Sequence, residues 1–163
     1  MTQPMDARFI DTLFEAFHEG DANVASKSEE ENNVRRVEEM YRAIARNDFE
    51  ALGESFADDV SLEIIGPPTS PMTGFHQGRQ RVVEATRNNF AQLEAQRPEI
   101  QSVVAQGDTV IVVGRERGRF RPTGRDYSLS WMHQFTFKGG KVIRIRELFD
   151  SSALLGAAGP GAQ

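Results

Sequence analysis

DYSLSWMHQFTFKGGKVIRIRELFD, residues 126–150, constrains the fold of this 163-residue chain more strongly than any other segment. Its first half, residues 127–137, alternates between large, mostly aromatic side chains and smaller, more polar ones. A period of two is typical of a β-strand with one apolar and one polar face. Gly139 and Gly140 follow, and two glycines between β-forming segments favour a tight turn because both can adopt positive φ. We therefore expect a hairpin of two long strands, the second over 141–149.

Two ionisable side chains lie on the hairpin face that we expect to be buried. His133 interrupts the aromatic row of the first strand, and Glu147 belongs to the more apolar set of the return strand, which begins at Ile143 and ends at Phe149. A buried ionisable group destabilises the fold unless it is paired. In one interpretation, the two bond to each other, to the backbone or to water and only hold the core together. In the other, they form an acid–base pair in a cavity whose wall includes Trp131.

Two further strands are predicted ahead of the hairpin, over 99–106 and 109–120, and the short links between the four strands predict an antiparallel meander. Alternate positions of the second strand carry a basic stripe made of Arg115, Arg117, Arg119 and Arg121. We interpret this stripe as a solvated or intersubunit face that pairs with acidic helices. Glu116 points to the opposite face, between Gly114 and Gly118, which leave room for it. It is a second candidate carboxylate of the cavity.

Apolar residues at helical spacing predict helices over 6–19, 34–46, 49–56 and 78–97. Pro98 ends the last of them, because proline cannot continue a helix. A short strand over 60–65 and a loop over 66–77, rich in Gly and Pro, precede that helix. Tyr41 lies at the edge of the apolar stripe of its helix, where a pocket would offer its hydroxyl a partner. Phe90 faces inward from the long last helix.

The first helix carries a tight apolar stripe made of Phe9, Ile10, Leu13, Phe14 and Phe17. It should therefore dock on the core, cover the mouth of a cavity or contact a second subunit. A polar linker over 21–33 follows, and we expect the C-terminal tail over 151–163 to be mobile. We divide the chain into an N-terminal helical extension and linker (1–32), one main domain (33–155) and a flexible tail (156–163).

Composition excludes several classes of protein. The lack of cysteine excludes disulfides, thiol nucleophiles and cysteine-ligated metals. The longest apolar runs are too short to span a bilayer and the N-terminus lacks a secretory pattern, so we expect a cytoplasmic protein. The net charge of −5 combines −10 over residues 1–63 with +5 over residues 64–163, which favours complementary packing within the domain or across a dimer. A pI near 5.3 argues against nucleic acid as a partner.

Motifs for cofactors and metals are also missing from the sequence. No glycine-rich phosphate loop or dinucleotide fingerprint lies between a strand and a helix. His18, His76 and His133 lie on a helix, a loop and a strand, without the spacing of metal ligands. We therefore expect neither a cofactor nor a metal.

The order of these elements resembles the SnoaL-like and ketosteroid isomerase-like group of the nuclear transport factor superfamily. The resemblance covers about residues 33–155 and rests on NDFEALGESFADDVSLEI (47–64), GRQRVVEATRNNF (78–90) and WMHQFTFKGGKVI (131–143), which leads to ELFD. It implies an α+β fold, a cone-shaped barrel in which a curved antiparallel sheet wraps around three helices and encloses a largely apolar pocket. The N-terminal helix would be an addition to that fold. The resemblance also implies a homodimer.

The resemblance can be carried over residue by residue. In ketosteroid isomerases a helix tyrosine and an acid on the penultimate strand donate hydrogen bonds to an oxyanion, and Tyr41 and His133 match these places. The base of those enzymes is a carboxylate at the end of the first strand, where this chain has Ile64, and the adjacent Glu63 should face outward. That departure argues against steroid isomerase chemistry of the known type. The Asp-Arg-Asp set of the superfamily's epoxide hydrolases cannot be assembled here. SnoaL-type polyketide cyclases resemble the chain in pairing a pocket carboxylate with a histidine, for which Glu147 and His133 could stand in.

Two hypotheses of function remain open. The first is a cofactor-independent isomerase, cyclase, dehydratase or hydrolase for an apolar small molecule, with Glu147 as general base, His133 as donor or proton shuttle and Tyr41 as assisting donor. The ligand would contact Trp131, Phe149, Ile64, Phe90 and Glu116. The second is a non-catalytic ligand-binding or scaffold domain of the same fold, which the missing carboxylate at Ile64 favours.

Overall fold

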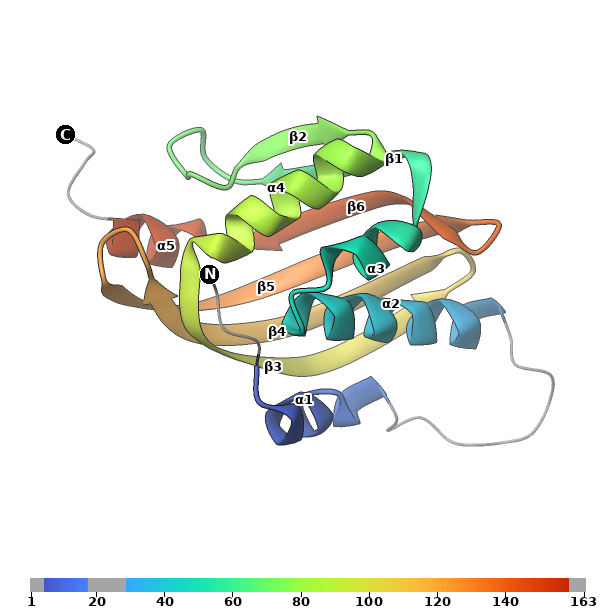
Figure 1. Cartoon of the computed structure of the whole chain (residues 1–163), viewed down its shortest axis with the longest axis horizontal. Coiled ribbons are helices and arrows are strands. Elements are labelled where there is room, and N and C mark those ends of the chain that lie inside the picture. The colour runs from blue at the N-terminus through green and yellow to red at the C-terminus, as the bar shows by residue number, and fades with distance from the viewer. Residues whose placement is uncertain (1–4, 18–28, 159–163) are drawn as a thin grey trace.

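The computed structural model describes residues 5–17 and 29–158, which form one six-stranded sheet with helices. The strands are β1 (Phe56–Ile65), β2 (Gly74–Gln77), β3 (Leu93–Gln106), β4 (Thr109–Phe120), β5 (Arg125–Lys138) and β6 (Lys141–Phe149). Their order is β2-β1-β6-β5-β4-β3, and neighbours are antiparallel except β1 and β6, which are parallel. The sheet is curved and does not close, so β2 and β3 form its edges (Figure 1).

The helices of the described residues are α1 (Ala7–Leu13), α2 (Glu29–Ala45), α3 (Phe49–Glu54), α4 (Arg79–Ala91) and α5 (Ser151–Ala158). Figure 1 shows α2, α3 and α4 lying over one face of the sheet, with α1 beside β3. This arrangement confirms the predicted α+β cone and its additional N-terminal helix. The sheet differs from the predicted antiparallel barrel in being open and in containing the parallel β1–β6 pair. No helix in the described part of the chain combines the length and the apolar composition needed to cross a bilayer.

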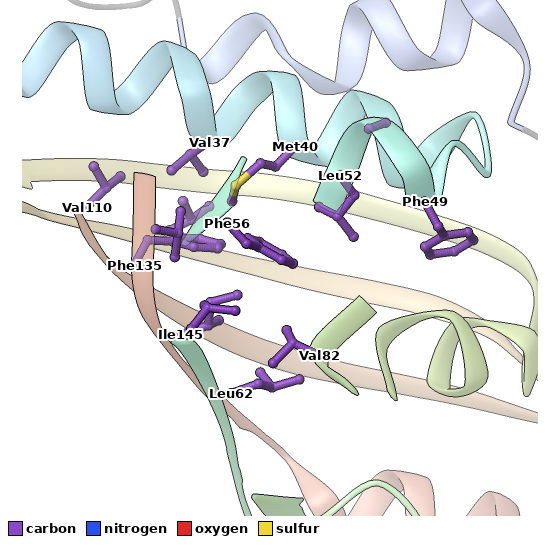
Figure 2. Packing of buried hydrophobic residues seen from close by; sticks show 14 of the residues in the cluster. Val37, Met40, Phe49, Leu52, Phe56, Leu62, Val82, Val110, Phe135 and Ile145 are labelled. Carbon is purple, nitrogen blue, oxygen red and sulfur yellow. The ribbon is translucent and has the colours of Figure 1, made fainter. Parts of the chain in front are cut away.

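The main hydrophobic core lies between the three helices and the sheet, as Figure 2 shows. It is built from side chains that are at most 5% exposed, among them Val37, Met40, Leu52, Leu62, Val82, Val110, Phe135 and Ile145. Burying one such large apolar side chain stabilises a fold by about 1.5–3 kcal/mol. The core therefore fixes the helices over the inner face of the sheet.

The β5–β6 hairpin forms as predicted, around Gly139 and Gly140 with φ values of 57° and 76°. One consequence of the predicted alternation is wrong: it places Val142, next to the inward-facing Ile143, on the outer face, but Val142 is fully buried. Thr136 pairs with Arg144, whereas Phe137 pairs with Val142, so β6 contains one extra residue at this point. A β-bulge of this kind changes which face the following residues occupy. After the bulge, Ile145, Glu147 and Phe149 lie on the inner face of the sheet, as predicted.

The helix predicted over 78–97 is shorter than expected, since α4 ends at Ala91 and residues 93–98 belong to β3. This segment is rich in good helix formers, but its backbone groups pair with the long strand β4 instead. Tertiary pairing of this kind overrides intrinsic helix propensity. Pro98, which was expected to end the helix, lies within β3. An edge strand tolerates proline because the missing N–H can face away from the neighbouring strand.

Several other boundaries also differ from the predictions. α2 begins at Glu29, inside the predicted linker, and residues 21–28 lie outside the described residues. β1 begins at Phe56 rather than residue 60, and β2 lies in the segment predicted to be a loop.

The tail that we expected to be mobile begins with a helix, α5. Its side chains Leu154 and Ala157 are only 1% and 3% exposed, and they pack with Phe120 and Tyr127 in a second small core. This burial explains why residues 151–158 are ordered. Residues 159–163 lie outside the described residues.

α1 docks on the domain, as one interpretation of its apolar stripe predicted. The Asp6 carboxylate caps it by accepting hydrogen bonds from two backbone N–H groups of the first turn. Phe14, just after the helix, is fully buried. The guanidinium of Arg42 lies 4.6 Å from the centre of the Phe14 ring and 3.2 Å from the carboxylate of Asp11. The predicted end of this helix, residues 18–19, lies outside the described residues.

Candidate active site

A largely apolar cavity of about 130 Å³ lies between the helices and the inner face of the sheet. An apolar cavity of roughly 150 Å³ holds a benzene-sized molecule, so this one is large enough for a small ligand. Its wall combines side chains from α1, α2, α4, α5 and strands β3 to β6. The polar side chains in the wall are Tyr41, Asn89, Gln96, Glu116, His133 and Glu147.

Tyr41 and His133 form the central hydrogen bond of this cavity. The hydroxyl oxygen of Tyr41 on α2 lies 2.7 Å from Nδ1 of His133 on β5. The Tyr41 hydroxyl has no other hydrogen bond within the described residues, so we assign it as the donor and Nδ1 as the acceptor. The ring proton of a neutral His133 then resides on Nε2, which has no protein partner in the same part of the chain. The imidazole is therefore a donor available to a ligand.

Burial keeps both members of this pair neutral. Removal from water lowers the pKa of His133 to about 3, so the imidazole carries no charge at neutral pH. Burial also raises the pKa of Tyr41 well above its usual range, and the nearby charge of Glu147 adds to this effect. The indole of Trp131 stacks on the imidazole with ring centres 4.5 Å apart and holds its orientation.

Glu147 lies directly opposite His133 in the β5–β6 register and lines the same cavity. Burial raises the pKa of its carboxyl group from 4.5 to about 7. No hydrogen bond or ion pair to this carboxylate is found among residues 5–17 and 29–158. His133 and Glu147 form no hydrogen bond with each other: Nδ1 of His133 bonds Tyr41, and the Glu147 side chain lines the cavity. An unpaired carboxylate with a pKa near 7 can accept a proton at neutral pH.

Glu116 on β4 is a second cavity carboxylate, as predicted. Its Oε1 accepts hydrogen bonds from the Tyr127 hydroxyl and from Nε2 of Gln96, the latter at 3.3 Å. Burial raises the pKa of its carboxyl group, and the two hydrogen bonds partly oppose that change.

The structure also places the other predicted ligand contacts. Trp131, Phe149 and Phe90 line the cavity as predicted. Ile64 does not: it is 2% exposed within the core and pairs in register with Glu147 from the neighbouring strand. The adjacent Glu63 faces outward, as expected, and its carboxylate accepts a hydrogen bond from Arg146 at 2.9 Å.

Sequence reasoning missed several residues of the wall, because they come from segments assigned to other roles. Among them are Met5, Leu13, Phe14, Gln96 and Leu154. Leu13 and Phe14 belong to the apolar stripe of the N-terminal helix, which was the only signal for them. Gln96 was hidden because its segment was expected to be helical, and Leu154 because its segment was expected to be mobile.

The arginine stripe of β4 lies on the opposite, outer face of the sheet and is largely paired. Arg115 bonds Glu99 at 2.8 Å, Arg119 bonds Asp126 at 3.1 Å, and Arg121 lies 3.5 Å from Glu94. These pairs support the interpretation of the stripe as an ordinary charged face. The acidic partners come from neighbouring strands rather than from the predicted acidic helices.

The fold and the cavity agree with the family to which the sequence belongs. The SnoaL-like domain profile matches residues 37–145, about two thirds of the chain, so the protein is a member of the SnoaL-like domain family. A crystal structure of an NTF2-like protein from Burkholderia xenovorans LB400 shares 31% identity, with a TM-score of 0.67, over 78% of this chain and 96% of that chain. No curated protein gives a significant match.

Two more distant structures share the fold. A protein from Jannaschia sp. CCS1, provisionally assigned as a SnoaL-like polyketide cyclase, has 16% identity and a TM-score of 0.72 over 87% of this chain and all of that chain. TerC, crystallised with polyporic acid, has 23% identity and a TM-score of 0.67 over 77% of this chain and 97% of that chain. The resemblance stated from the sequence is therefore confirmed for family and fold.

Proposed function

We propose that the protein is a cofactor-independent acid–base catalyst that moves a proton on a small, largely apolar carbonyl compound. The observation that carries this proposal is the unpaired carboxylate of Glu147 beside a neutral His133 whose Nδ1 is occupied by Tyr41. Isomerisation and cyclisation through an enolate both begin with such a proton transfer. The provisional assignment of the Jannaschia protein as a SnoaL-like polyketide cyclase is consistent with this class of reaction.

In the proposed step, a carboxylate oxygen of Glu147 removes a proton from the carbon next to the substrate carbonyl. The electron pair of the broken C–H bond forms the enolate double bond, and the carbonyl oxygen gains the negative charge. The Nε2–H of His133 donates a hydrogen bond to that oxygen and stabilises the charge as it develops. Glu147 then returns the proton to the same carbon or to another one, which regenerates the carboxylate.

The electrostatics of the cavity suit this division of roles. A general base works best with a pKa near the working pH, and the pKa of Glu147 is about 7. A neutral imidazole with a pKa near 3 stays a donor throughout the physiological range and does not neutralise the base. Tyr41 fixes the tautomer that presents Nε2–H to the substrate.

Exchange of α-protons in D₂O, followed by NMR, tests this proposal with a panel of aryl and cyclic methyl ketones. The wild type should catalyse exchange of at least one ketone, with a rate that rises with pH and is half-maximal near pH 7. Glu147→Gln should lower the rate by about 10²–10⁴-fold, the usual contribution of a general base. Glu84→Gln, an exposed α4 residue, is the matched control and should exchange like the wild type. Ketones that bind without exchange in the wild type would contradict catalysis and support a ligand-binding domain.

We also propose that the protein is a homodimer that associates through the outer face of the sheet. Met132 on β5 and Leu148 on β6 are cross-strand neighbours on this face and are 41% and 50% exposed. Adjacent exposed apolar side chains of this kind often mark interfaces. Sedimentation velocity should find a dimer for the wild type and a monomer for Met132→Glu/Leu148→Glu. A monomeric wild type would contradict the proposal.

A further inference from the structure

Glu116 lies at the end of the cavity remote from His133 and Glu147. It pairs with Leu129 of β5, four residues along that strand from His133. At about 3.3 Å per residue, the two positions are roughly 13 Å apart along the strand. β4 and β5 lie side by side in Figure 1, so Glu116 and the group formed by Tyr41, His133 and Glu147 lie toward opposite ends of the cavity, with Trp131 between them.

Aromatic rings cover the two glycines that flank Glu116 on β4. A Cβ atom on Gly114 would lie 2.3 Å from the Trp131 ring, and one on Gly118 would lie 2.6 Å from the Tyr127 hydroxyl. The two aromatic rings therefore lie flat across the glycines on either side of Glu116. They occupy the space that the sequence suggested was left for Glu116 itself.

One oxygen of this carboxylate is engaged and the other is available. Oε1 accepts both hydrogen bonds, from Tyr127 and Gln96, and Oε2 has no hydrogen bond within residues 5–17 and 29–158. Glu116 lines the cavity, whose wall at this end also contains Pro98 and Ile100. Oε2 therefore keeps free acceptor capacity toward the space that Glu116 lines, and a ligand that supplies a donor can use it.

We propose that Glu116 binds a hydroxyl group of the ligand and thereby determines substrate specificity. This inference rests on the proposed function for the other end of the ligand, where the carbonyl meets His133. The ligand class is then a flat aromatic ketone of one ring, as a cavity of about 130 Å³ allows, with a hydroxyl at the end remote from the carbonyl. A neutral hydroxyl suits the apolar wall better than an ammonium group, whose desolvation is far more costly.

Binding of two matched probes tests this assignment: 4-hydroxyacetophenone and 4-methylacetophenone, which differ only in a hydroxyl replaced by a methyl of similar size. Fluorescence titration is carried out in the Glu147→Gln background, so that binding is measured without the proposed base and a failure of catalysis does not affect the result. The hydroxyl probe should bind about tenfold more tightly, as expected for a hydrogen bond to a charged acceptor. Adding Glu116→Gln should lower the affinity for the hydroxyl probe about tenfold and change the affinity for the methyl probe by less than twofold.

Adding Glu84→Gln instead is the matched control and should leave both affinities unchanged. Equal affinity of the two probes before Glu116 is changed would overturn the assignment, as would the failure of both to bind. A Glu116→Gln change that weakened both probes equally would also overturn it, because it would indicate that Glu116 only supports the fold. Unchanged binding of the methyl probe in that variant shows that the cavity is intact.

Discussion

Glu147→Gln should change the pH dependence of stability in a direction that distinguishes a buried, unpaired carboxylate from an ordinary one. The folded protein has a Glu147 pKa of about 7, above the ordinary value of 4.5 that the unfolded chain should show. Between these two values the folded state binds the proton more tightly than the unfolded state. Stability therefore falls as pH rises from about 4.5 to 7, and the glutamine variant, which cannot titrate, avoids this loss.

The size of the effect follows from the shift of about 2.5 pKa units. At 1.36 kcal/mol per unit, the wild type should lose about 3 kcal/mol relative to the variant across this range. His133 acts in the opposite direction, because its pKa of about 3 in the folded protein lies below the usual 6.5. Its contribution to the free energy of unfolding therefore increases as pH rises from 3 to 6.5. In the wild type, the loss of stability due to Glu147 and the gain due to His133 nearly cancel between pH 4.5 and 6.5. The glutamine variant keeps only the gain due to His133, so its stability rises with pH over this range.

Urea unfolding at a series of pH values from 4.5 to 8 measures this difference. The free energy of unfolding of Glu147→Gln should rise relative to the wild type by about 3 kcal/mol from the lowest to the highest pH. Glu84→Gln should run parallel to the wild type, because its side chain is exposed. Parallel curves for Glu147→Gln and the wild type would refute the claim that Glu147 is a desolvated carboxylate.

Three further substitutions, one of them with a matched control, test the Tyr41–His133 bond, the docking of α1 and the packing of Trp131. Tyr41→Phe removes the hydroxyl that donates to the imidazole, so the rate of ketone exchange should fall about tenfold. The free energy of unfolding should fall by about 1 kcal/mol. An unchanged exchange rate would show that Tyr41 has no part in the mechanism. Phe14→Ala should lower the urea-unfolding free energy by about 3–5 kcal/mol, and a loss below about 1 kcal/mol would show that α1 is not firmly docked. In thermal unfolding, Gly114→Ala should lower the free energy of unfolding by about 1–3 kcal/mol, because its Cβ is forced against the Trp131 ring. Gly156→Ala is the matched control: its Cβ meets nothing within 4 Å, so it should be neutral or stabilise the fold by up to about 1 kcal/mol. Equal effects of the two glycine changes would contradict the packing described for Trp131.

Alternation along the strands was enough to predict the central part of the site. The period of two placed His133, Trp131 and Glu147 on one face, and it assigned Glu116 to the same side of β4. A strand's side chains must alternate, so local sequence determines the face once the strand is recognised. Helical spacing of apolar residues predicted the helices, and the family resemblance then supplied their place against the sheet around a pocket.

The remaining features depend on tertiary contacts that local patterns do not encode. The bulge in β6 moves Val142 inward because the two strands differ by one residue in length at that point. The segment after α4 is helix-forming by composition and becomes part of β3 only because β4 offers a pairing partner. The bond between Tyr41 and His133 joins residues 92 positions apart, so neither residue's neighbours indicate it.

The pKa of the Glu147 side chain is the most direct test, and carbon-13 NMR of glutamate-labelled protein can measure it. The Glu147 carboxyl signal is assigned as the one that disappears in Glu147→Gln, and its chemical shift is followed from pH 3 to 9. A midpoint near pH 7 is predicted. A Glu147 midpoint between about 4 and 5 would mean that the carboxylate is solvated or paired, and the proposed base would be lost.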